Sequence, residues 1–125
     1  MTYDQMKDAL GAIADGVPEE IYHKLNGGII LSPETKIHPK SVGKELVING
    51  EYHNEPYGMG RYIILYYGSL MRSYGHLSDE KLMKKVKEVL YHELIHHLES
   101  MAGDRSLERS DAEFLDNYLR KRKQK

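Results

Sequence analysis

Residues 78–103 read SDEKLMKKVKEVLYHELIHHLESMAG and contain the longest helical pattern in the chain. Apolar side chains recur there at intervals of three and four residues, which places them on one side of a helix. Ser78 stands where an N-cap is favoured, and Gly103 stands where a helix commonly ends. The pattern predicts one long amphipathic helix whose apolar side packs against the rest of the chain.

The remaining sequence predicts a small sheet and further helices around this one. Thr2 and Gln5 form a capping box before a helical pattern over 3–15, and Ser110 with Glu113 repeats that box before a last helix. Pro18 opens a second, short helix. Apolar or aromatic runs predict strands at 29–31, 46–48 and 61–67, the second of which can continue to Tyr52. Residues 32–45 and 54–60 are expected to be loops. We therefore expect an α+β fold in which a small β-sheet packs against the long helix.

Composition restricts the classes of partner. The 125 residues suit a single domain over 1–125, and 18 Lys and Arg against 19 Asp and Glu give a formal charge of −1. No overall field draws such a chain to nucleic acid or to an anionic membrane. There is no cysteine and no apolar run of membrane-spanning length, so we expect a cytoplasmic protein that acts on a peptide, protein or small molecule. The sequence indicates no oligomeric state.

The long helix carries His92, Glu93 and His96 in the arrangement H-E-x-x-H. Residues four apart share a helix face, so the two imidazoles can hold one zinc ion while Glu93 projects beside it. Glu93 would then be the general base for a water bound to that zinc. About 0.04 occurrences of this motif are expected by chance in a chain of this composition. The spacing predicts a zinc-dependent peptidase.

The third metal ligand is open on the sequence alone. Glu99 shares the ligand face, but it lies about 10 Å beyond His92 along the helix axis. If the helix ends at Gly103 and the chain turns back, Asp104 or Asp111 can approach from outside. The order of preference is Asp111, Glu99, Asp104. His97 points to the apolar side of the helix, so we expect a buried, hydrogen-bonded histidine there.

These segments together resemble the small zincin-like metallopeptidases, short bacterial proteins that are also called minimal metalloproteases. The resemblance rests on IILYY at 63–67, HELIHH at 92–97 and SDAEFL at 110–115, and it covers roughly residues 61–119. The blocks LNGGIILSPE at 25–34 and GEYHNEPYGMGRYI at 50–63 also look like one branch of that group. The resemblance implies a compact zincin core with a strand beside the motif helix. It also implies zinc held by two histidines and an acidic residue, and it favours Asp111 as that residue.

One departure from the family pattern concerns the metal site. The family commonly has a glycine three residues after the second histidine and an aspartate three residues later, where this chain has Glu99 and Ala102. The alternatives to a peptidase are a non-catalytic metal-binding or protein-interaction module on the same scaffold, and a structural domain without metal. If the strand at 61–67 borders the cleft, its free edge could pair with an extended peptide. The basic end, RKRKQK, is expected to complement its helix terminus and stay solvated.

Overall fold

The computed structural model describes residues 1–105 and 107–123. The helices in chain order are α1 (Tyr3–Asp15), the short 3₁₀-helix η1 (Glu19–Tyr22), α2 (Tyr67–Tyr74), α3 (Asp79–Gly103) and α4 (Arg109–Lys123). The strands are β1 (Gly28–Ser32), β2 (Lys36–Ile37), β3 (Val47–Ile48), β4 (Gly50–Glu55) and β5 (Gly60–Tyr66). The fold is α+β, as the sequence predicts. Within the described ranges, no helix is long and apolar enough to cross a membrane.

The main sheet has three strands in the order β1-β5-β4. β1 runs parallel to β5, with Gly28 opposite Tyr62, whereas β4 and β5 form an antiparallel hairpin in which Gly50 lies opposite Leu65. β2 and β3 form a separate two-stranded ladder. The prediction that the 61–67 strand has a free edge is wrong, because β5 is paired on both sides. The edge strands of this sheet are β1 and β4, and of the two it is β4 that lies beside α3.

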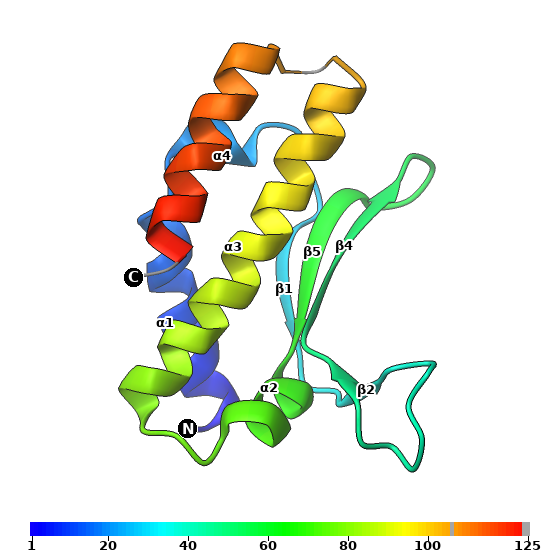
Figure 1. Cartoon of the computed structure of the whole chain (residues 1–125), viewed down its shortest axis with the longest axis vertical. Helices are drawn as coiled ribbons and strands as arrows, with labels where there is room; N and C mark the ends of the chain where they lie inside the picture. The colour runs from blue at the N-terminus through cyan, green and yellow to red at the C-terminus, as the bar shows by residue number, and fades with distance from the viewer. Residues whose placement is uncertain (106, 124–125) are drawn as a thin grey trace.

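The long helix α3 lies across one face of the sheet, and α4 returns antiparallel beside it, with α1 on the side away from the β4–β5 hairpin (Figure 1). The core forms where these layers meet. Its fully buried side chains come from the helices and from β5, and they include Met6 of α1, Ile63 and Leu65 of β5, Leu90 and Leu94 of α3, and Leu119 of α4. Burial of such side chains contributes roughly 1.5–3 kcal/mol each. The apolar side of α3 is therefore occupied on both flanks, by the sheet and by the other helices.

Three helix predictions have clear outcomes. The helix over 3–15 is confirmed, and Thr2 and Gln5 form both hydrogen bonds of the capping box. The long helix is also confirmed, with the Ser78 hydroxyl accepting from the Lys81 backbone N–H. The last helix begins at Arg109, so Ser110 lies inside its first turn and is not the N-cap.

Helix α2 was not predicted, and its packing explains why. The strand β5 leads directly into it, through a Tyr-Tyr pair that favours extended structure. At its start, Gly68 donates a hydrogen bond to the Glu34 carbonyl, and a Cβ there would clash with the Thr35 hydroxyl oxygen. Contact with a segment more than thirty residues earlier in the sequence thus fixes the turn.

Candidate metal centre

The motif residues lie in the middle of α3, where the helix passes β4. One turn separates His92 from His96, and their Nε2 atoms are 3.1 Å apart. The two rings meet edge to face, with centroids 4.6 Å apart. Both histidines are exposed, while the Glu93 side chain between them is buried at 7% exposure. The helix therefore presents two imidazole nitrogens to the surface and one carboxylate to the interior.

The spacing of the two nitrogens fits a zinc ion. Tetrahedral geometry with Zn–N bonds of about 2.0–2.1 Å places two ligand nitrogens roughly 3.3 Å apart. A ligand imidazole must also be neutral. Burial, the neighbouring His96 and Lys123 all lower the pKa of His92, which favours that state. In residues 1–105 and 107–123, however, no group of three His, Asp or Glu side chains is close enough together to hold a metal. The structure brings together two metal-binding groups.

Glu93 lies where two cavities meet along the groove between α3 and β4. The first cavity has a volume of about 410 Å³ and the second about 600 Å³. The first is lined by Ile48, Asn49, Gly50, Glu88, Val89, His92, Glu93 and Lys123. The second is lined by Glu51, Tyr52, Glu93, His96, Glu99 and Ser100. We call the two together the α3–β4 groove. Burial raises the pKa of the Glu93 carboxyl, which moves it toward the range of a general base.

The open edge of β4 forms one wall of this groove. In an antiparallel pair, residues alternate between those whose backbone groups bond to the partner strand and those whose groups point away. The Asn49 carbonyl accepts from the Tyr66 N–H, which fixes the alternation. The backbone groups of Gly50 and Tyr52 therefore point to the open edge. Gly50 allows this wall to lie close to the helix, because a Cβ there would be 2.8 Å from Val89 Cγ1.

His97 links the motif helix to β4 and to the segment before β1. Its Nε2 lies 2.8 Å from the His23 carbonyl oxygen, so that nitrogen carries the proton and donates. Its Nδ1 then accepts from the Tyr52 hydroxyl at 2.9 Å. The ring is fully buried, and burial lowers its pKa to about 4. The expectation of a buried, hydrogen-bonded histidine at 97 is confirmed.

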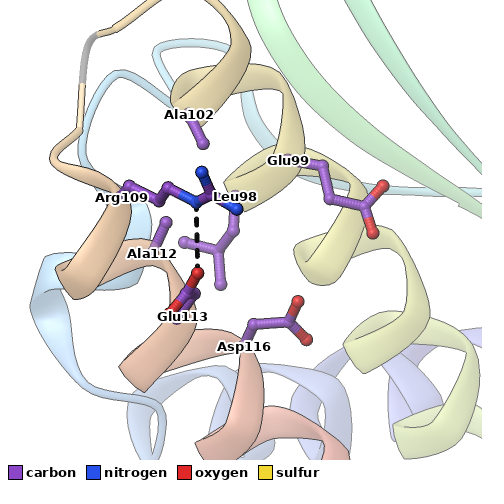
Figure 2. A pocket seen from close by; sticks show the side chains of 7 residues that line it. All are labelled: Leu98, Glu99, Ala102, Arg109, Ala112, Glu113 and Asp116. Carbon is purple, nitrogen blue, oxygen red and sulfur yellow. Dashed lines mark hydrogen bonds and ion pairs between the residues drawn. The ribbon is translucent and has the colours of Figure 1, made fainter.

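Glu99 approaches the histidine pair from the C-terminal side. Its Oε2 is 3.7 Å from His96 Nδ1, the ring nitrogen opposite the one that faces His92. Glu99 and Asp116 extend toward the same side of the helix pair (Figure 2), and the Arg120 guanidinium contacts both carboxylates. The contact is longer than a hydrogen bond, but the Glu99 carboxylate lies on the Nδ1 side of the His96 ring, the side from which carboxylates commonly orient metal-binding histidines.

The structure does not bring the other two acidic candidates to the histidines. Asp111 lies in the first turn of α4 and lines a separate cavity with Pro18 and Phe114. Since Asp116 lies near Glu99, Asp111 is about 12 Å from the level of His96 along the helix pair. Asp104 forms an ion pair with Arg61 at the start of β5.

Two groove residues were missed in the sequence, namely Tyr52 and Lys123. The Lys123 ammonium lies 3.4 Å from His92 Nδ1, so the prediction of a wholly solvated basic end is wrong for this residue. The i, i+3 and i+4 spacing of α4 signals that one side faces α3, but it does not indicate the register between them. The signal for Tyr52 was present in the sequence, as the continuation of the 46–48 strand past Gly50.

Comparison with known proteins finds a structurally similar protein whose description names no activity. The structure is similar to a solved structure described as a conserved hypothetical protein from Thermus thermophilus. The two share 34% sequence identity with a TM-score of 0.69, over 82% of this chain and 99% of that one. No family model matches the sequence, and no curated protein matches it.

Proposed function

This chain belongs to the same family as the conserved hypothetical protein from Thermus thermophilus, and from its own residues we propose a zinc-dependent metallopeptidase that hydrolyses peptide bonds. The observation that carries the proposal is the pair of histidine Nε2 atoms 3.1 Å apart beside the buried Glu93 carboxylate. The description of that relative names no activity, so the proposal depends on the chemistry of these side chains.

The chain's own groups have separate roles in this proposal. His92 and His96 would hold the metal through Nε2. Zinc, when bound, would act as a Lewis acid that polarises the scissile carbonyl and lowers the pKa of a bound water molecule to near neutrality. Glu93 accepts the proton of the attacking water and passes it to the nitrogen of the leaving amine. Its raised pKa suits both transfers, because the same carboxyl must gain and then lose the proton.

The β4 edge would hold the substrate in the groove. An extended peptide can add to an open strand edge through main-chain hydrogen bonds. The backbone groups of Gly50 and Tyr52 point to that edge, within the same groove as Glu93. This places the strand-pairing role on β4. A peptide or protein substrate, with no nucleic acid and no membrane, remains part of the proposal, as does a cytoplasmic location.

Glu99 is the acidic residue that this proposal assigns to the metal centre, in a positioning role. Its contact with His96 Nδ1 favours a proton on that nitrogen and leaves the Nε2 lone pair for the metal. Asp111 has no part in the proposal, because α4 places it beside another cavity.

The test compares zinc content and peptide hydrolysis in matched variants. Glu93→Gln should retain zinc and lose hydrolysis of internally quenched peptides, because the amide cannot accept the proton. His92→Ala should lose both zinc and hydrolysis. Glu80→Gln makes the same chemical change at an exposed position earlier in α3 and should alter neither. An active Glu93→Gln enzyme would refute the assigned base.

A non-catalytic metal-binding module is the second candidate. It is favoured by the finding that the described residues assemble two metal-binding side chains and no third. It predicts stoichiometric zinc that requires His92 and His96, with no hydrolysis by the wild-type protein. If wild type and His96→Ala both fail to bind zinc, both candidates are excluded.

A further inference from the structure

We propose that the α3–β4 groove binds short peptides by their free C-terminal carboxylate, and that the Lys123 ammonium is the group that binds it. The inference rests on the proposed peptidase function and specifies its substrate class. It concerns Lys123 of α4, which lies outside the motif and was not connected with the site by the sequence.

Lys123 reaches the groove from the last described turn of α4. That helix runs antiparallel beside α3 (Figure 1), which brings its C-terminal end level with the motif. The ammonium is 3.4 Å from His92 Nδ1, and the side chain lines the first cavity with Gly50 and Glu93. A cation is thus held at one end of the groove, next to the proposed metal ligand.

Among the described residues Lys123 has no anionic partner, and it differs from Lys121 and Arg122, which also lack one, in that its ammonium lines the cavity beside His92. Arg120, on the same helix, contacts the carboxylates of Glu99 and Asp116, and Lys85 lies 3.6 Å from Glu88. No described carboxylate is within 4 Å of Lys123. An ammonium that lines a cavity and has no carboxylate within reach is suited to an anionic ligand. For a peptide in this groove, the anion at the chain end is its terminal carboxylate.

The position of the Lys123 ammonium determines the direction of the peptide. The second cavity is lined by Glu51, Glu93 and Glu99 and by no described lysine or arginine, and the cations beside it, Lys36 and Arg120, are paired with Glu51 and Glu99. A terminal carboxylate is therefore better accommodated at the Lys123 end. β4 starts at Gly50, at the Lys123 end, and runs toward Tyr52 at the acidic end. A peptide with its C-terminus at Lys123 therefore runs antiparallel to β4.

The position of Lys123 also limits how far the cleaved bond lies from the peptide end. The ammonium is within one residue length of His92, since an extended chain advances about 3.3–3.6 Å per residue. The terminal carboxylate would then follow the cleaved bond by one or two residues. In hydrolysis the amide C–N bond breaks, the water oxygen bonds to the carbonyl carbon, and a proton goes to the leaving nitrogen. The released product is an amino acid or a dipeptide.

Binding, measured separately from turnover, tests the proposal. The probes are trialanine and trialanine amide, titrated into the metal-free protein and the zinc-loaded Glu93→Gln variant, with backbone amide NMR shifts as the readout. We expect trialanine to bind at least about tenfold more tightly than the amide, as a charge-assisted contact allows. Lys123→Met should abolish this preference, and Lys123→Arg should retain it. Lys121→Met removes an exposed lysine on the same helix and should leave the preference unchanged.

The outcomes separate this inference from the peptidase proposal. Equal binding of acid and amide, or a preference that survives Lys123→Met, would overturn the role of Lys123. Absence of binding by either peptide would overturn the substrate class. Because the metal-free protein is titrated as well, a carboxylate preference without zinc uptake would support the anchor and refute the metallopeptidase. Zinc uptake and hydrolysis of larger peptides without any carboxylate preference would support the metallopeptidase and refute the role of Lys123 as the anchor.

Discussion

Replacing Gly50 by alanine should destabilise the protein by about 1–2 kcal/mol, because β4 is pressed against the core at this residue. An alanine Cβ would lie 2.7 Å from Leu65 Cδ2 and 2.8 Å from Val89 Cγ1, and Leu65 is fully buried. Both distances are about 1 Å shorter than normal carbon contacts. Overpacking of this kind costs roughly 1–3 kcal/mol, offset by about 0.5–1 kcal/mol from the reduced chain entropy of alanine.

The assay is thermal unfolding of wild type and two single variants, followed by circular dichroism. For a chain of this length, 1 kcal/mol corresponds to about 4 °C in Tm, so Gly50→Ala should lower Tm by about 4–8 °C. Gly11→Ala is the matched control, because no heavy atom lies within 4 Å of its added Cβ and it is exposed in α1. The control should raise stability by about 1 kcal/mol through helix propensity. If both variants were stabilised alike, β4 would not be in tight contact with α3.

Two further substitutions test the groups around the motif. Glu99→Ala should weaken zinc affinity by about 10–100-fold, the range expected when an orienting partner of a ligand histidine is removed. Glu113→Ala, on the far side of the cavity that Glu99 and Glu113 both line, should leave zinc affinity unchanged. Competition with a chromogenic chelator measures both affinities, and equal values for the two variants would show that Glu99 does not support the metal centre. His97→Leu should lower the free energy of unfolding by about 1–3 kcal/mol, because it leaves the Tyr52 hydroxyl and the His23 carbonyl without their hydrogen-bond partner. Urea denaturation measures this change, and an unchanged midpoint would contradict a stabilising role for the His97 hydrogen bonds.

The elements that the sequence predicted well are those whose signals lie within one segment of the chain. The limits of α3 follow from the Ser78 cap, the helical spacing of apolar residues and Gly103, all within one segment. The motif geometry follows in the same way, since a helix sets the relation of His92 to His96 without help from the rest of the chain.

The missed features depend on pairings between distant segments. β5 is the central strand because β1, more than thirty residues earlier in the sequence, pairs with it in parallel. The sequence of neither strand indicates which strand it pairs with. The position of Asp111 depends on the register of α4 along α3, which is determined by packing between the two helices. The same register places Lys123 beside the groove. Local patterns predicted the metal-binding pair, but the surroundings of that pair required the tertiary structure.

The open edge of β4 also bears on self-association. An uncovered strand edge can template pairing with a second copy of the same chain, which is a route to aggregation. β4 carries Glu51 and Glu55, and Pro56 follows it directly. If two copies of β4 paired antiparallel about His53, Glu51 of each would lie opposite Glu55 of the other, and like charges in that position repel. The strand can thus remain open to an unlike chain while its own sequence disfavours pairing with itself.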